Sequence, residues 1–272
     1  MVIRVLVPCV DKTIDQVKEL ALFLRVESEA IFLDQNGVDG RESFTLNGHN
    51  VEVICTKAKG VSMARNLLIK NANCDVGLFI DDDCVLSSGY VQEIEKAYAE
   101  FPSAEAIRFN TVRTYWNPVN AHATKDRKAK FSDLSSFGMW GLSFKPKAFI
   151  DKGIFFDERL GMPNYLYNGE DSVFLFDLCQ KSNEVYLSSF YICEVKETKK
   201  STWFENFDKR YFVTKGYVYT HLYGINWPFA LARMYLKYHK DYKMKYPLVR
   251  KYAALGHAMY KEHFYEEPKD DE

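Results

Sequence analysis

Three consecutive aspartates, Asp81, Asp82 and Asp83, follow an apolar run over residues 76–80. The run is typical of a buried strand, so the carboxylates should lie where that strand stops. Like charges this close repel one another and stay partly protonated unless a cation sits among them. Carboxylate oxygens suit Mg²⁺ or Mn²⁺, and such ions commonly bridge to a substrate phosphate. The pattern indicates a metal and phosphate site, although acidic residues at strand ends are also common as solvated turn residues.

A predicted helix precedes this strand and begins after Gly60. Ser62 can cap the helix, and Arg65 and Asn66 lie in its first turns. A guanidinium at this position can meet a diphosphate or hold one of the aspartates. The alternative is that Arg65 lies on an exposed helix face.

A second acidic pair, Glu170 and Asp171, follows a loop marked by Gly161 and Gly169. The pair begins a helix that is apolar almost all round and is therefore predicted to be buried. Acidic residues at a helix N-terminus can cap free N–H groups and complement the helix dipole. Alternatively, the rigid helix holds one carboxylate as a general base, and the preceding loop opens and closes.

The elements that position these residues alternate between strand and helix over the first hundred residues. Such alternation predicts a mostly parallel sheet with helices on both faces, which binds ligands beyond the carboxyl ends of its strands. Pro8, Asp34 and Asp81 all fall at such ends. Asp34 can therefore hydrogen-bond a nucleotide base or ribose, or it can serve as a turn residue. The predicted strands cover residues 3–7, 30–33, 51–54 and 76–80.

Beyond residue 110 the pattern loosens, and two further features stand out. Trp140 lies in a glycine-rich strand-like run, where its ring can stack against a sugar or join the core. Residues 217–265 are rich in aromatic residues and lysine, with a helical period broken at Pro228 and Pro247. Such helices pack on the domain, or lie on an anionic membrane with basic side chains at the headgroups. We expect an α/β domain over residues 1–215 and a helical C-terminal extension over 216–272.

Composition narrows the class of protein. A net charge of −1 argues against general nucleic-acid binding. Six cysteines without a C-x-x-C pair indicate reduced thiols in a cytosolic protein rather than disulfides or zinc. No signal-peptide pattern is seen, and no run approaches the roughly twenty apolar residues of a membrane span. We therefore expect a cytoplasmic protein.

Taken together, the chain resembles bacterial glycosyltransferases of the GT-A fold, family 2, over most of residues 1–215. The stretches that carry the resemblance are VIRVLVPCV as the first nucleotide-binding strand, KGVSMARN as the loop–helix element, FIDDDCVL as the DxD motif and GEDSVF as the ED motif. The segment KKSTWFENFDKRYFVTKGY resembles one found in small members that build polysaccharides. The resemblance implies a Rossmann-like GT-A sheet flanked by helices.

The resemblance also implies an inverting transfer of a sugar from a nucleotide-sugar, with UDP expected, to a hydroxyl acceptor in a surface or capsular polysaccharide. Asp171 would be the base and Glu170 would orient the loop. Mn²⁺ or Mg²⁺ would be held by Asp83 with Asp81 nearby. The family often supplies a histidine as third ligand, but none occurs between residues 191 and 203, so Glu197 would replace it. The expected donor contacts are Pro8, Asp34, Arg65, Asp81 and Asp82, and the expected acceptor contacts are Trp140 and Trp203.

The acceptor expected from this resemblance is a glycan or lipid-linked sugar at the inner face of the membrane, reached through the C-terminal region. Two other functions stay open. A metal-dependent nucleotidyltransferase would share the nucleotide-binding sheet and acidic site but would release pyrophosphate. A non-catalytic relative would bind a glycan or a partner enzyme; the missing histidine is compatible with it, whereas the two intact acidic pairs argue against it.

Overall fold

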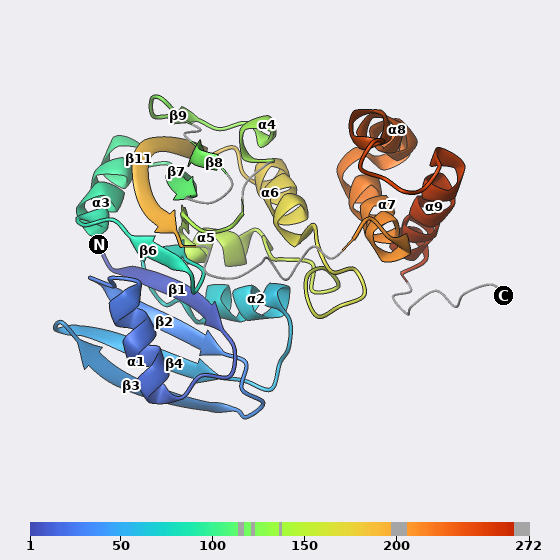
Figure 1. The fold of residues 1–272 in the computed structure, drawn as a ribbon. Coiled ribbons are helices and arrows are strands. Elements are labelled where there is room, and N and C mark those ends of the chain that lie inside the picture. Colours follow the sequence, from blue (N-terminus) through green and yellow to red (C-terminus); the bar gives the residue numbers. More distant parts are fainter. Residues whose placement is uncertain (114–116, 121–122, 136–137, 197–205, 264–272) are drawn as a thin grey trace. The chain divides into compact units, whose positions relative to one another are not determined.

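A computed structural model describes residues 1–113, 117–120, 123–135, 138–196 and 206–263 (Figure 1). The chain divides into two compact units, in each of which the residues mainly contact residues of the same unit. The first comprises the described parts of residues 1–59, 63–155 and 177–200, and the second those of 60–62, 156–176 and 201–272.

A mixed sheet forms the first unit, with strand order β3-β4-β2-β1-β5-β10-β7-β11-β6 (Figure 1). Strands β4, β2, β1 and β5 are parallel, as are β7 and β11, whereas β3, β6 and β10 pair antiparallel with their neighbours. The predicted α/β architecture is therefore confirmed, with antiparallel strands added to a parallel centre. The strands are β1 (Ile3–Cys9), β2 (Glu29–Asp34), β3 (Gly40–Leu46), β4 (His49–Cys55), β5 (Val76–Phe79), β6 (Cys84–Leu86), β7 (Ala106–Arg113), β8 (Asn117–Asn120), β9 (Arg127–Lys128), β10 (Leu142–Phe144) and β11 (Val185–Val195).

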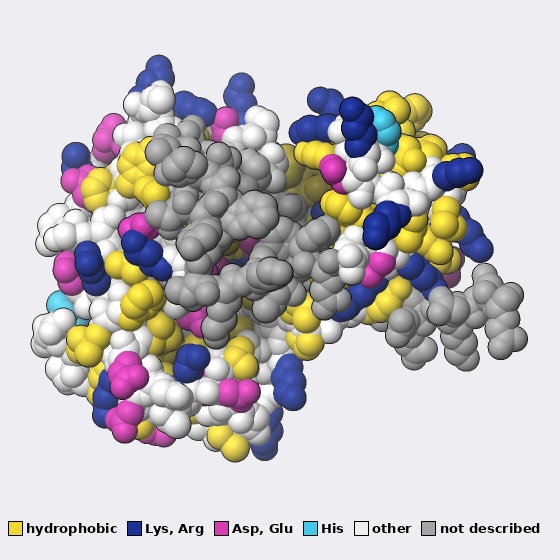
Figure 2. Space-filling model, viewed as in Figure 1, with side chains coloured by type: hydrophobic (Ala, Val, Ile, Leu, Met, Phe, Trp, Pro, Cys, Tyr) yellow, Lys and Arg dark blue, Asp and Glu magenta, His cyan; other side chains and the backbone are white. Residues whose placement is uncertain are grey.

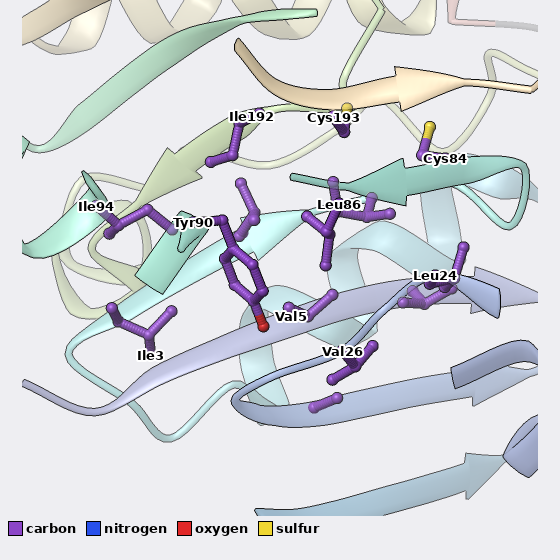
Figure 3. Close-up of a cluster of buried hydrophobic side chains, with 14 of the residues drawn as sticks. Ile3, Val5, Leu24, Val26, Cys84, Leu86, Tyr90, Ile94, Ile192 and Cys193 are labelled. Carbon is purple, nitrogen blue, oxygen red and sulfur yellow. The ribbon is translucent and has the colours of Figure 1, made fainter. Parts of the chain in front are cut away.

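Alternate side chains of the central strands point to opposite faces of this sheet. On one face, Val5 of β1 packs with side chains of α1 and α3, as Figure 3 shows around Leu24 and Tyr90. Tyr90 is fully buried, and its hydroxyl is satisfied by a 2.7 Å hydrogen bond with Ser28. The other face carries stacked rings of Phe79, Phe144 and Phe149. The helices of the first unit are α1 (Ile14–Phe23), α3 (Tyr90–Glu100), α4 (Phe131–Leu134) and α5 (Pro146–Asp151).

Two helices run across the division between the units. They are α2 (Val61–Asn71) and α6 (Glu170–Lys181). Helix α2 therefore begins with two residues of the second unit, and α6 begins in the second unit and ends in the first. Glu170 and Asp171 therefore begin a helix that belongs to both units, whereas the aspartate triplet follows strand β5 within the first unit.

The second unit is mainly helical, with α7 (Lys209–Tyr223), the 3₁₀ turn η1 (Gly224–Asn226), α8 (Trp227–Tyr238) and α9 (Tyr246–Glu262). The predicted breaks at Pro228 and Pro247 are helix starts, where proline lacks only an N–H that has no intrahelical partner. Gly216 of α7 and Gly256 of α9 allow backbone-to-backbone packing, since a Cβ at either would overlap a carbonyl of the other helix. No described helix combines the length and the apolar character needed to cross a bilayer.

Candidate active site

The aspartate triplet forms the connection between β5 and β6. Ile80 is buried behind it, and the Cys84 N–H donates to the Asp81 carbonyl at 3.2 Å. Chain order reverses here: β2 lies on one side of β1, and β5 on the other. In open α/β sheets such a switch point is where ligands bind, beyond the carboxyl ends of the strands. The structure therefore places Asp34 and Asp81 at the strand ends that flank the end of β1.

Arg65 reaches this edge from α2. Its side chain is buried, and Nη2 donates to Asp81 Oδ1 at 3.1 Å. The alternative that Arg65 lies on an exposed helix face is therefore wrong. The prediction that Arg65 holds an aspartate is confirmed. The reason is the helix register, which turns Arg65 toward the sheet together with the buried Ala64 and Leu68.

Asp83 of the aspartate triplet has a perturbed carboxyl group. Burial, followed by the negative charges of Asp81 and Asp82, raises its pKa to about 6. The Cys84 thiol donates weakly to Asp83 Oδ1 at 3.4 Å, and the Lys196 N–H fixes the Asp83 carbonyl at 2.7 Å. A half-buried carboxylate with negative neighbours is thus held in place by its backbone, in surroundings that favour a cation.

Asp34 is fully buried at the end of β2. Both of its carboxylate oxygens accept the Lys12 N–H at 3.2 Å, which fastens the turn after β1. Burial, with the charge of Asp11 added, raises the pKa of Asp34. Asp34 therefore has a structural role in the turn after β1, while its predicted roles as a turn residue of residues 34–37 and as a nucleotide contact stay predictions. Pro8 is the penultimate residue of β1, half-buried and paired with Leu33.

Cys9 is a site neighbour that the sequence did not single out. Burial raises the pKa of its thiol, and the charges of Asp34 and Asp82 act in the same direction. Cys9 therefore lies near both carboxylates, with Asp82 itself exposed. Its position as the last residue of β1, in register with Asp34, is the signal that would have found it.

In the second unit, Glu170 and Asp171 occupy the first two positions of α6, after Gly169. Both side chains are half-buried. Gly161 lies against this helix start: a Cβ there would come within 3.4 Å of both Glu170 Cδ and Ser62 Oγ. The Ser62 hydroxyl donates to the Leu160 carbonyl at 2.7 Å. The predicted cap at Ser62 is therefore wrong, because α2 already begins at Val61 and the hydroxyl instead fastens the loop.

The loop before α6 is tied to α7 by charged hydrogen bonds. Asp157 accepts from Arg159 at 2.5 Å and from the Tyr217 hydroxyl at 2.7 Å. Arg210 donates to the carbonyls of Asn164 and Tyr165 at 2.7 and 2.8 Å. These bonds attach the loop to α7 in this structure, and opening and closing of the loop stays a prediction.

Lys215 of α7 is a further neighbour that sequence reasoning missed. Burial lowers the pKa of its ammonium group, and the charge of Glu170 opposes that shift. Its Nζ also lies 5.1 Å from the centre of the Tyr211 ring. The available signal was its place in the segment after the ED motif.

The remaining predicted site residues divide into two groups. Trp140 is half-buried and packs against the core of the first unit, as the core interpretation requires. Glu197 and Trp203 lie outside the described residues. Within the described ranges, no group of three or more His, Cys, Asp or Glu side chains is arranged to hold a metal ion. The complete metal ligand set therefore stays a prediction.

The sequence model of the family described as Glycosyl transferase family 2 matches residues 5–149, which is more than half of the chain. The chain belongs to glycosyl transferase family 2. The matched range contains Arg65 and the aspartate triplet of this glycosyltransferase, whereas Glu170 and Asp171 lie beyond it. Curated protein sequences gave no match.

Solved structures of S. aureus TarS are similar to this glycosyltransferase. The crystal structure of TarS 1–349 has a TM-score of 0.66 at 14% identity, covering 97% of this chain and 82% of that one. The complex with UDP-GlcNAc gives 0.67 at 13% identity, covering 93% and 79%, and the complex with UDP gives 0.62 at 13%, covering 100% and 95%. At such low identity the likeness establishes the fold, and the predicted GT-A architecture is confirmed.

Proposed function

We propose that this glycosyltransferase moves a sugar from a UDP-sugar to a hydroxyl acceptor with inversion, in the synthesis of a surface or capsular polysaccharide or a related glycan. One observation carries the proposal: a family 2 chain has Arg65 and three aspartates at the switch point of a GT-A sheet. UDP and UDP-GlcNAc, the ligands of the TarS complexes, support this donor class.

A divalent ion, Mn²⁺ or Mg²⁺, is part of this proposal. The donor set fits such an ion, because Asp81 and Asp83 offer oxygen atoms, and the pKa of Asp83 is raised first by burial and then by the negative charges of Asp81 and Asp82. Asp83 would hold the ion with Asp81 nearby, and Glu197 would be the third protein ligand. A bound ion neutralises the charge that builds on the departing diphosphate.

On the donor side, Arg65 holds Asp81 in position through their hydrogen bond, and Arg65 is also a proposed contact of the diphosphate. Asp82 is exposed beside Cys9 and is a second donor contact. Asp34 and Pro8, at the ends of β2 and β1, complete the proposed nucleotide contacts. The physical basis is the meeting of three parallel strand ends at one edge.

The acceptor side of the reaction is assigned to the second acidic pair. Asp171 removes the proton of the acceptor hydroxyl as that oxygen attacks the sugar, and Glu170 orients the loop. The Lys215 ammonium offsets the charge of Glu170, so that a second negative group beside the base is partly compensated. Trp140 and Trp203 are the proposed acceptor contacts. A lipid-linked acceptor at the inner membrane face would place the domain of residues 1–215 at the bilayer, with residues 216–272 as the extension that contacts it.

Calorimetry with UDP tests the donor and metal parts together. We expect binding in the presence of Mn²⁺, with affinity that falls sharply in excess chelator and in Asp83→Ala. Equal affinity with and without metal would remove the ion from the proposal. A screen of nucleotide-sugars for metal-dependent release of UDP then identifies the donor, and release of pyrophosphate instead would point to a nucleotidyltransferase.

A further inference from the structure

Helix α8 presents large apolar side chains on two opposite faces. Trp227, Leu231 and Met234 are buried in the core of the second unit. Phe229 and Leu236 lie two helical turns apart on the other face, 77% and 73% exposed. Single exposed apolar residues are normal, but an aligned series of them marks a contact surface.

The exposed face continues beyond the helix. Ile225, in the turn η1 directly before α8, is 90% exposed. Tyr223 and Tyr238 are exposed at the two ends of this stretch. Aromatic side chains with one polar end are suited to a boundary between water and an apolar phase. The exposed row of Ile225, Phe229 and Leu236 is therefore apolar along its length, and a partly exposed tyrosine lies at each end of this stretch of sequence.

The charged side chains in this part of the sequence are mostly positive. Between residues 224 and 263 the sequence contains eight Lys and Arg against two Asp and Glu. Two basic side chains are exposed beside this row. Arg233 is four residues after Phe229, and Lys237 directly follows Leu236. Figure 2 shows hydrophobic side chains beside Lys and Arg on the surface of this unit. A partner of this surface must accept apolar side chains and supply negative charge.

We propose that the surface of Ile225, Phe229, Arg233, Leu236 and Lys237, the α8 surface, binds an anionic lipid bilayer. Its apolar side chains enter the boundary between headgroups and acyl chains, and its basic side chains meet the headgroups. A second copy of the chain fits less well, because matching α8 surfaces would bring like charges together. The proposal rests on the bilayer contact of residues 216–272 proposed above and names the surface that makes it, but it requires no assumption about the donor sugar or the catalytic base.

Flotation with vesicles tests the proposal on the whole protein. The vesicles contain phosphatidylcholine with an equal amount of phosphatidylglycerol, and phosphatidylcholine alone serves as comparison. We expect binding to the anionic vesicles at low salt that weakens as salt is added. Burial of each large apolar side chain is worth on the order of tenfold in partitioning, so Phe229→Ser with Leu236→Ser should lower binding by about a hundredfold.

The double variant Arg233→Gln with Lys237→Gln measures how much the two basic side chains contribute to vesicle binding. Each charge near an anionic surface is worth about fivefold in partitioning, so this pair should lower binding about twenty-five-fold and flatten the salt dependence. Leu22→Ser is the matched control, because Leu22 of α1 is 58% exposed and belongs to the first unit. The control should bind vesicles like the wild type.

Insertion of the α8 surface into the bilayer is measured by the fluorescence of a tryptophan introduced as Phe229→Trp, with Leu22→Trp as the control. Brominated lipid should quench the fluorescence that Phe229→Trp adds, but not the fluorescence that Leu22→Trp adds. Loss of binding counts only when thermal unfolding of the variant matches the wild type. Absence of binding at low salt, or equal loss in the Leu22 control, overturns the proposal. The proposal is also overturned if the α8 variants change from dimer to monomer while their binding to vesicles is unchanged. This face would then be a self-association surface.

Discussion

Asp171 shows how one carboxylate can be tested for two roles. Helix α6 begins at Glu170, so the residue immediately before the helix is Gly169, and Asp171 lies one position inside. At that position its structural contribution is the interaction of a negative charge with the helix dipole, worth about 0.3–1 kcal/mol. A catalytic base lowers the activation free energy of the reaction by far more than that. The size of the effect of a substitution therefore distinguishes the two roles.

Asp171→Asn keeps the shape of the side chain and loses its ability to accept a proton. We expect kcat to fall by about 10²–10⁴-fold, with donor affinity nearly unchanged and stability lower by about 1 kcal/mol at most. Steady-state kinetics with the identified donor, and thermal unfolding, measure both. Asp177→Asn, later on the same helix, is the control and should keep its turnover. A kcat near that of the wild type in Asp171→Asn would move the search for the base to Glu170.

The pair of the buried Arg65 and the half-buried Asp81 can be tested with a double-mutant cycle. A buried charge that loses its partner costs up to about 3–5 kcal/mol, while removing both charges costs less. We expect Asp81→Asn, which leaves the buried Arg65 charge without this partner, to destabilise, and the double variant with Arg65→Met to recover part of the loss. A coupling free energy of about 1–3 kcal/mol from urea unfolding is the expected result. Additive effects of the two changes would mean that the 3.1 Å contact contributes no net stability.

At the scale of elements, the loop before α6 depends on α7. Asp157 is the centre of that attachment: burial by itself would raise its pKa, but hydrogen bonds from Arg159 and Tyr217 outweigh burial and hold the pKa below its ordinary value. A carboxylate with a depressed folded pKa contributes stability above the unfolded pKa. That stability is lost as pH falls through the lower folded pKa.

Tyr217→Phe removes one of the donors to Asp157. A hydrogen bond to a charged group contributes about 1.5–3 kcal/mol, so the variant should be less stable by about that amount at neutral pH. The difference from wild type should shrink below about pH 4, where the carboxyl becomes protonated. Urea unfolding at several pH values measures it. The control is Tyr235→Phe, whose hydroxyl donates to the neutral Met244 carbonyl and whose loss should not depend on pH.

The contact between α7 and α9 depends on two glycines. Alanine at Gly216 would place a methyl group against the Ala253 carbonyl, and backbone atoms cannot rotate away as a side chain can. We expect Gly216→Ala to destabilise by about 3 kcal/mol or more. Gly40→Ala is the comparison, since its Cβ would meet only Cys55 Cβ at an ordinary 4.0 Å. Equal midpoints of thermal unfolding for the two variants would contradict the close helix contact.

At the scale of the whole molecule, ligand binding should raise the stability of the folded protein. A ligand at a hundred times its Kd contributes about 2.7 kcal/mol when the unfolded chain does not bind it. We expect UDP with Mn²⁺ to raise Tm, UDP with chelator to give little change, and Asp83→Ala to lose the effect. A Tm increase that persists in chelator would show that UDP binds without the ion.

The class of fold and the place of both acidic motifs in it can be predicted from the order of residues along the chain. Alternating apolar segments are enough to predict a sheet with helices on both faces, because period and burial are local properties of the chain. The strand-end positions of Asp34 and Asp81 followed from the same pattern. Pro228 and Pro247 likewise marked helix boundaries, since proline acts on its own backbone.

The partner that each side chain meets cannot be predicted in this way, because it depends on how the elements pack. Arg65 on Asp81, Ser62 on Leu160, and Lys215 near Glu170 join positions far apart in the sequence. The antiparallel strands β6 and β10 and the raised pKa of Asp83 likewise depend on chain segments brought together by packing. A sequence pattern reports which face of an element is apolar, whereas contacts and local charge depend on distances that exist only after folding.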